Sequence, residues 1–354
     1  MGIINVYGKW NLEKNDWNKN FSYHDRGRAF AIAKYEEIIN NPNDGIDYIV
    51  LAYGTRVEDH SKDYINIKDS VNGIDKVISY FKNKNKNIVI ELFLMDADAP
   101  IVEDAKKMAS YIDRLSSLSN TNSVNLIGLS KCGAMAFNIP KYFRNLSSFN
   151  KTNVYTIASP FTGTKLASPG IFYPEVERKI ISIFGNNRIS NLIYNGVISA
   201  YEGVSSNSHM DYDIAMLGGI SGDKLKLYDD SLIKNMFSKD NLDAIQKVAK
   251  YRNLVTGIDD KTLNEAIKTL NFNGIGLCVL NDMLFDGKSD GMVSISAQKE
   301  VELYYEDVSF KSDILVSSHH DVASCDRVFN DVLYIVDDTI DEYNDRAKCR
   351  RRVK

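Results

Sequence analysis

The chain has 354 residues, of which 44% are hydrophobic and 25% are charged, and its formal net charge is −4. This composition excludes a mainly disordered or collagen-like chain. The acidic balance lacks the basic footprint of a dedicated nucleic-acid-binding protein. A chain of this length can bury a core that needs no disulfide or metal ion to hold it together.

The cysteines and the apolar stretches bear on the cellular compartment. Cys132, Cys278, Cys325 and Cys349 are widely spaced and form no C-x-x-C pair. This pattern argues against a zinc ribbon, a thioredoxin-like site and a disulfide framework. It is typical of a protein from a reducing compartment. The N-terminus lacks the basic start and apolar run of a signal peptide, and no apolar stretch is long enough to span a bilayer. We therefore expect a cytoplasmic protein.

Residues 346–354 (RAKCRRRVK) carry the strongest local charge excess, with six basic residues and no acidic one. Such a segment can make weak contact with an anionic membrane surface or with nucleic acid. It can equally be a solvated helix end. Because the rest of the chain is acidic, we expect no nucleic-acid partner, while contact with a membrane surface stays open.

From residue 28 onward, the sequence predicts alternating helices and strands. The strands are apolar throughout rather than alternating, which is typical of a parallel sheet covered by helices on both faces. The fold class is therefore α/β. Helices are expected at 28–39, 102–115 and 131–144, the last bent or ended by Pro140, and buried strands at 47–52, 87–94, 124–128 and 153–159.

Residues 165–285 break this rhythm, and the pattern resumes with a strand at 313–317 and a helix near 326–341. We expect the interruption to be a large helical cap, with one core strand near 274–280. The predicted organisation is an α/β core in two parts, 1–168 and 286–345, with the cap insertion at 169–285 and a basic tail at 346–354.

The segment VNLIGLSKCGAMAF (124–137) is the most informative in the chain. Gly128, Ser130 and Cys132 have the spacing of the nucleophile elbow G-x-S-x-G, between an expected strand and an expected helix. The turn is so tight that only small residues fit two positions before and after the serine, and Cys132 is a small substitute for glycine. The pattern predicts a nucleophilic Ser130 beside a helix N-terminus that favours negative charge. An ordinary strand–turn–helix junction with a capping serine is the alternative.

A nucleophilic serine needs a base, which lies downstream in the hydrolase order Ser…Asp/Glu…His. This order disfavours His24 and His60, and His209 falls in the expected cap. His319 and His320 follow the last expected strand. We expect His320 to be the base, with His319 as the alternative, and a surface histidine pair is the remaining possibility.

The base needs a carboxylate to orient it. Asp290 is followed by Gly-Met-Val-Ser, a turn that returns into an apolar run, and it precedes His320 by 30 positions. Asp286 is the weaker candidate, because an Asp-Gly pair often does no more than form a turn. We expect Asp290 to be the acid.

Two backbone N–H groups should stabilise the oxyanion. One is expected from Lys131, the residue after the serine, and the other from the loop after strand 47–52. In that loop Gly54 lets the backbone approach the substrate, and Thr55 is the more suitable donor. A plain turn at the end of the strand is the alternative.

Taken together, these segments resemble the α/β-hydrolases, in particular the bacterial triacylglycerol lipases and esterases. In that group a histidine is often followed six positions later by an acidic residue, as His320 is by Asp326, which is the reason to prefer His320. Three departures, Phe161 and Tyr53 in place of histidine and Cys132 in place of glycine, put the substrate class in question more than the fold. The resemblance is carried by GLSKCG at 128–133, ASPFTGTKLAS at 158–168, SDGMVS at 289–294 and SSHHDVASCDRV at 317–328.

The resemblance implies an α/β-hydrolase fold with a large helical cap and a serine hydrolase acting on acyl esters or lipids through Ser130, Asp290 and His320. It implies no metal and no organic cofactor. An acyltransferase, thioesterase or peptidase can use the same three residues, because the triad serves every acyl transfer. A non-catalytic binding protein that retains the fold is the alternative from a different class. The oligomeric state is left open.

Overall fold

The chain divides into two compact units, which are described separately. The first comprises Met1–Ile157, Ser238–Leu254 and Val322–Lys354, and the second comprises Ala158–Phe237 and Val255–Asp321. The computed structural model describes residues 9–11, 16–18, 30–37, 45–55, 76–81, 84, 86–96, 101–163, 236–257, 289–290, 293–305, 312–316, 319 and 330–342, together with scattered residues between 177 and 195.

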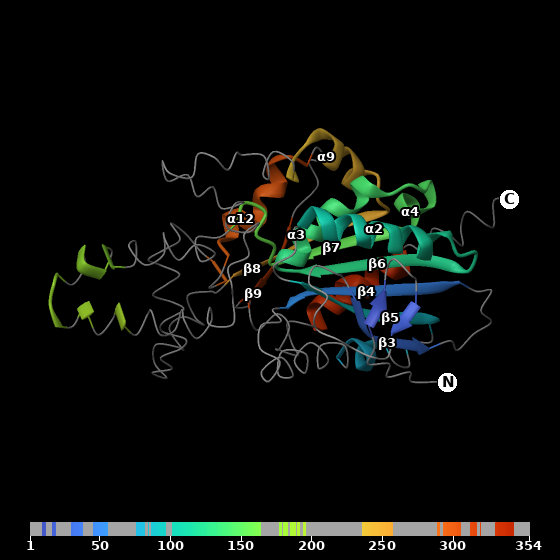
Figure 1. Cartoon of the computed structure of the whole chain (residues 1–354), viewed down its shortest axis with the longest axis horizontal. Coiled ribbons are helices and arrows are strands. Elements are labelled where there is room, and N and C mark those ends of the chain that lie inside the picture. Colours follow the sequence, from blue (N-terminus) through green and yellow to red (C-terminus); the bar gives the residue numbers. More distant parts are fainter. Residues whose placement is uncertain are drawn as a thin grey trace. The chain divides into compact units, whose positions relative to one another are not determined.

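A seven-stranded sheet is the central element (Figure 1). Its strand order is β3-β5-β4-β6-β7-β8-β9. The pairs from β5 through β4, β6 and β7 to β8 are parallel, whereas β3 is antiparallel to β5. The strands are β3 (Phe30–Glu37), β4 (Ile46–Thr55), β5 (Ile88–Asp96), β6 (Thr121–Leu129), β7 (Thr152–Ile157), β8 (Lys250–Gly257) and β9 (Asp313–Val316). A separate two-stranded sheet joins β1 (Lys9–Asn11) to β2 (Asp16–Asn18).

This strand order, with one antiparallel strand at the β3 edge and a sharp strand-to-helix turn after β6, is the α/β-hydrolase fold. The expected parallel α/β sheet is therefore confirmed. The strands expected at 47–52, 87–94, 124–128, 153–159 and 313–317 correspond to β4, β5, β6, β7 and β9.

The helices of the first unit have the expected amphipathic faces. In α2 (Ile101–Ser117) the stripe of Ala105, Met108, Ala109 and Ile112 is buried, as its spacing predicts. α3 (Lys131–Asn138) ends just before a single turn of 3-10 helix, Ile139–Tyr142, which contains Pro140. α4 (Leu146–Lys151) and α9 (Lys239–Gln246) also belong to the first unit.

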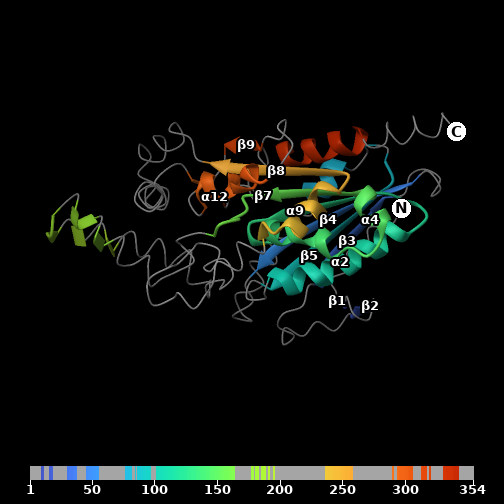
Figure 2. The ribbon, with the colours of Figure 1, turned by 90° about the horizontal axis from the view of Figure 1, so that it is seen from above.

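Two neighbours in β7 show that helices cover both faces of the sheet, because successive strand residues point to opposite sides. The Thr156 hydroxyl lies 3.1 Å from the Tyr251 hydroxyl, and the Tyr251 ring contacts Phe137 of α3. The Tyr155 hydroxyl instead lies near Thr339, in the helical segment 330–342. In Figure 2 this segment (red) and α2 lie on opposite sides of the strands.

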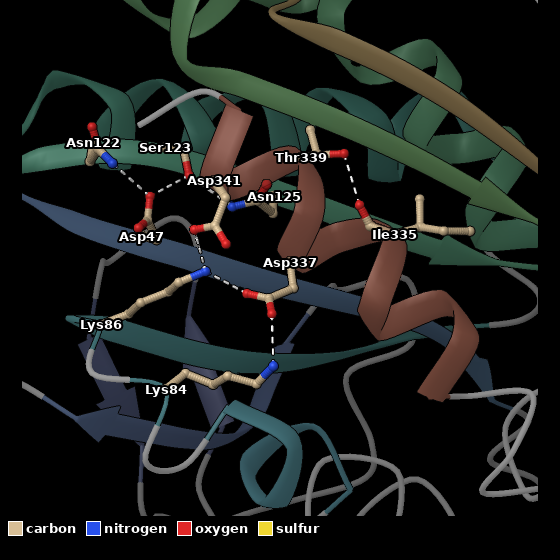
Figure 3. Close-up of polar contacts among 10 residues, drawn as sticks. All are labelled: Asp47, Lys84, Lys86, Asn122, Ser123, Asn125, Ile335, Asp337, Thr339 and Asp341. Atoms are coloured by element: carbon tan, nitrogen blue, oxygen red, sulfur yellow. Dashed lines mark hydrogen bonds and ion pairs between the residues drawn. The ribbon is translucent and has the colours of Figure 1, made fainter. Parts of the chain in front are cut away.

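The same helical segment is fastened to the start of β5 by lysines (Figure 3). The Lys86 ammonium lies 2.5 Å from Asp337 and 2.6 Å from Asp341, and the Lys84 ammonium lies 3.0 Å from the second oxygen of Asp337. Asp337 is 8% exposed, so its charge is held in a largely buried ion pair.

Two expectations differ from the structure. In place of the helix expected at 28–39, residues 30–37 form β3, which pairs antiparallel with β5. A short apolar run does not distinguish a helix from a strand, and here the backbone edge of β5 supplies the partner that favours the strand.

The second difference concerns the expected cap at 169–285. β8, at 250–257, belongs to the central sheet although it falls inside that range. The strand expected near 274–280 lies outside the described residues. Polar residues such as Arg252 and Asn253 interrupt the apolar run of β8, which hides it in the sequence.

Candidate active site

Ser130 occupies the turn between β6 and α3. Its backbone has φ 55° and ψ −126°, a conformation that non-glycine residues rarely adopt and that costs about 1–3 kcal/mol. The Ser130 N–H donates to the carbonyl of Ile157 (2.8 Å), and its own carbonyl accepts from Gly133 N–H (2.9 Å). These bonds tie the strained residue to β7 on one side and to the first turn of α3 on the other.

Gly128 explains why this turn can be so tight. A Cβ at position 128 would lie 2.2 Å from the carbonyl oxygen of Cys132 and 2.9 Å from Cβ of Ala136. Only glycine lets β6 pass this close to the first turn of α3. The Cys132 side chain is 1% exposed, so it fills the buried side of the turn where the G-x-S-x-G pattern has glycine.

The structure places Ser130 at the N-terminus of α3 and leaves its side chain partly exposed. The positive end of the helix dipole and the first N–H groups of α3 favour negative charge here. Lys131, the first residue of the helix, is expected to supply one of these N–H groups to an oxyanion.

Gly54 and Thr55 are the last two residues of β4, and both are paired with β5. The sequence predicts them in a loop beyond the strand instead. The pairing of β4 with β6 ends at Ala52 and Gly128, whereas its pairing with β5 continues to Thr55 and Asp96. β4 therefore extends past the strand that leads into Ser130.

In the second unit, His319 and Asp290 contact each other twice. The ring Nδ1 of His319 lies 2.8 Å from Oδ2 of Asp290, and the His319 backbone N–H donates to the Asp290 carbonyl, also at 2.8 Å. The His319 side chain is 10% exposed and that of Asp290 is fully buried. With Nδ1 bonded to the carboxylate, Nε2 is the ring nitrogen suited to proton transfer.

Among the described residues, three further groups donate to the Asp290 carboxylate. Val293 N–H donates to Oδ1 (2.7 Å), and the Thr256 hydroxyl (2.6 Å) and the Gln298 side-chain amide (3.2 Å) donate to Oδ2. A buried carboxylate is costly unless hydrogen bonds compensate it, and four donors do so here.

Of the predicted site residues, the structure pairs Asp290 with His319, the alternative base. His320, the preferred base, lies outside the described residues, as do Asp286, His24, His60 and His209. Sequence reasoning missed Thr256 and Gln298. The available signals were weak: Thr256 is the next-to-last residue of a strand that polar residues interrupt, and Gln298 lies in the five-residue helix α12 (Ile295–Lys299).

Within the described ranges, no group of three or more His, Cys, Asp or Glu side chains could hold a metal ion. In the same part of the chain, no helix combines the length and apolarity needed to cross a membrane.

No protein-family model and no curated protein sequence matches the chain. Solved structures with similar folds include the mature lipase BlEst2 of Bacillus licheniformis (13% identity, TM-score 0.40, covering 87% of this chain and 99% of that one). Another is a peroxisomal α/β-hydrolase of Saccharomyces cerevisiae (11% identity, TM-score 0.43, covering 88% of this chain and 81% of that one). A third is a thermostable carboxyl esterase of Bacillus coagulans (10% identity, TM-score 0.39, covering 91% of this chain and 97% of that one).

Proposed function

We propose that this protein is a serine hydrolase that cleaves carboxylic esters, with Ser130 as nucleophile, His319 as base and Asp290 as the orienting acid. The observation that carries the proposal is the strained Ser130 at the junction of β6 and α3. A capping serine needs no such backbone conformation, whereas a nucleophile elbow does.

The Asp290–His319 contact supplies the second half of the proposal. Asp290 and His319 follow β8 and β9 in the chain, and Ser130 follows β6. This is the order Ser…Asp…His of the α/β-hydrolases. The chain order of the three residues therefore supports their assignment to the three triad roles.

The proposed reaction has two balanced halves. Ser130 Oγ attacks the ester carbonyl carbon while its proton passes to His319 Nε2. The tetrahedral intermediate collapses, and the alcohol leaves with that proton, so that an acyl-Ser130 ester remains. Water then attacks this ester and gives a proton to the same nitrogen. The proton returns to Ser130 Oγ as the carboxylic acid departs.

The oxyanion of both intermediates would be held by backbone N–H groups. Lys131 N–H, at the start of α3, is the first, and an N–H from Gly54 or Thr55 at the end of β4 is the second. The position of Lys131 in the helix N-terminus and the extension of β4 past β6 support this assignment.

The substrate class belongs to the same proposal. We place the chain with carboxylesterases and lipases, with the parts of residues 169–285 that lie outside α9 and β8 providing a cap and the basic tail 346–354 making weak contact with a membrane surface. A cytoplasmic location goes with this assignment. Esters of graded acyl length, from acetate to palmitate, would show how deep the acyl-binding region is.

The test is labelling with a fluorophosphonate, which reacts only with an activated serine, followed by mass spectrometry of the digested adduct. We expect the adduct on Ser130, and we expect Ser130→Ala and His319→Ala to abolish it. If His320→Ala abolishes labelling and His319→Ala does not, the base is His320 and the enzyme class stands. If the wild-type chain does not label in the presence of detergent, the hydrolase proposal fails and a binding function takes its place.

A further inference from the structure

Asp290 is held at the end of β8 although it is distant from β8 in the chain. β8 ends at Gly257, and residues 258–288 separate it from the pair Ser289–Asp290. The contacts of the Asp290 carboxylate with Thr256, Val293 and Gln298 orient it at this strand end.

The side-chain amide of Gln298 binds the backbone of Thr256 as a neighbouring strand would. Its Oε1 accepts the Thr256 N–H (2.7 Å), and its Nε2 donates to the Thr256 carbonyl (3.0 Å). The same Nε2 lies 3.2 Å from Asp290 Oδ2 and 3.2 Å from the Val293 carbonyl. One fully buried amide therefore connects the strand end, the turn after Asp290 and the carboxylate.

The direction of the Thr256 hydroxyl proton follows from the distances. Thr256 Oγ1 lies 2.6 Å from Asp290 Oδ2 but 3.3 Å from Gln298 Oε1, and a hydroxyl has a single proton. The shorter bond to the charged acceptor is the stronger one. Thr256 thus donates to the carboxylate oxygen that also accepts from His319.

Gln298 is itself fixed by the short helix α12. Ser294 caps this helix, accepting from Ala297 N–H at 3.1 Å through its side chain and from Gln298 N–H at 3.1 Å through its carbonyl. Ser294 also forms a β-bridge with Ser289, the residue before Asp290. The frame that carries Gln298 is therefore built from the residues on either side of the acid.

We propose that Thr256 and Gln298 are positioning residues that set the direction and the effective charge of the Asp290 carboxylate toward His319. This inference rests on the proposed function, since it assigns both residues to the acid–base pair of that mechanism. Neither residue touches the substrate in it. They act only through Asp290.

The first test compares three threonine variants in the full chain, with a p-nitrophenyl ester as substrate. Thr256→Val keeps the shape but removes the hydroxyl, and we expect kcat to fall about 10- to 100-fold with KM within about 2-fold. The acid limb of the kcat/KM profile should move to higher pH, because a carboxylate with one donor fewer holds the imidazolium proton more strongly. Thr256→Ser should restore kcat to within about 3-fold, since it restores the hydroxyl.

Thr152→Val is the matched control. Thr152 is equally buried in a strand of the sheet, and its hydroxyl has no hydrogen-bond partner among the described residues. We expect kcat and the pH profile of this variant to match the wild type. A Thr256→Val variant with the wild-type pH profile and kcat would overturn the inference, and so would a loss of kcat that Thr256→Ser does not recover.

Gln298→Glu tests the amide separately. The new carboxylate would place an oxygen against three acceptors, the Thr256 and Val293 carbonyls and Asp290 Oδ2, so we expect a loss of kcat of about 100-fold or more. If this variant does not fold, Thr256→Val still decides the question.

A readout without catalysis separates this inference from the proposed function. The Nδ1–H proton of His319, bonded to Asp290, should give a downfield proton NMR signal that is absent in His319→Ala. A shift of this signal in Thr256→Val but not in Thr152→Val supports positioning even if Ser130 fails to label. An unchanged signal in Thr256→Val overturns it whether or not the protein is a hydrolase.

Discussion

His319 meets Asp290 through both its ring and its backbone, each at 2.8 Å, so the imidazole is fixed in direction before any substrate arrives. The backbone bond fixes the position of the residue, and the ring bond fixes the tautomer, with Nδ1 facing the carboxylate. The backbone bond does not depend on the charge of the Asp290 side chain, so that charge can be removed while the position of His319 is kept.

Asp290→Asn makes that change. The amide keeps the size of the side chain and the backbone contact to His319, but it loses the charge that stabilises an imidazolium. By the behaviour of other triads, kcat should fall about 10³- to 10⁴-fold. Steady-state hydrolysis of a p-nitrophenyl ester measures this. Asp331→Asn, at an exposed position in the segment 330–342, is the control and should retain full activity. An Asp290→Asn variant within about 10-fold of wild type would remove Asp290 from the mechanism.

Gly128→Ala should destabilise the protein because the added Cβ would meet the Cys132 backbone at 2.2 Å. Backbone cannot rotate away, so we expect a loss of about 3 kcal/mol or more in the free energy of unfolding. Urea denaturation measures it. Gly257→Ala is the matched control, since its Cβ would meet side-chain atoms of Ile295, Cδ1 at 2.7 Å and Cγ1 at 3.4 Å, and a side chain can move. Equal losses in the two variants would contradict this account of the turn.

Tyr111 gives the protein a specific alkaline instability. Its hydroxyl donates to the buried Glu91, and burial, followed by the Glu91 charge, holds the pKa of Tyr111 well above its ordinary value. A raised pKa means that the stabilisation is complete below about pH 10, where the unfolded tyrosine is still neutral, and is lost as pH rises through the higher pKa of the folded state.

Tyr111→Phe should remove that loss. Between pH 9 and pH 11 the wild type should lose about 1 kcal/mol more of its free energy of unfolding than the variant does. At neutral pH the variant should be less stable by about 1–3 kcal/mol, because Glu91 loses a donor. Urea midpoints at the two pH values test both statements. Tyr334→Phe, at an exposed tyrosine, should leave the pH dependence unchanged. Parallel pH profiles of wild type and Tyr111→Phe would disprove the assignment.

The two lysines that form ion pairs with the segment 330–342 should contribute differently to the free energy of unfolding. Lys86 contacts two carboxylates and its side chain is 16% exposed, whereas Lys84 contacts one and is 40% exposed. Lys86→Met should lower the free energy of unfolding by about 1–3 kcal/mol, since it leaves the buried Asp337 with less compensation. Lys84→Met should cost about 0.5 kcal/mol or less, because an exposed pair is screened by water and salt. Urea denaturation at low and high salt compares them, and a larger effect of Lys84 would reverse this ranking.

Local patterns in the sequence were enough to predict the turn that holds Ser130. The spacing of Gly128, Ser130 and Cys132 reflects contacts within a few residues, and the apolar runs around it indicate strands buried on both faces. The sequence therefore predicts the α/β-hydrolase core and Asp290, and the contact of Asp290 with His319 agrees with the alternative base rather than with the spacing of His320 to Asp326.

What the sequence does not show depends on distant partners. The strand β3 forms because the edge of β5, more than 50 positions later, accepts it. The bonds between Thr256 and Gln298 join residues 42 positions apart, with no periodic or motif signal at either end. Such contacts become visible only once the sheet brings the two segments together.

The ion pairs at Asp337 join two segments that are made at different times during synthesis. Lys84 and Asp337 are separated by 253 positions, so the ribosome makes β5 long before it makes the helical segment that covers this face. Until residues 330–342 emerge, Tyr155 and its neighbours on that face of the nascent sheet are open to water and to chaperones. Asp337 and Asp341 can pair with Lys84 and Lys86 only after that, so we expect these ion pairs to form late in synthesis.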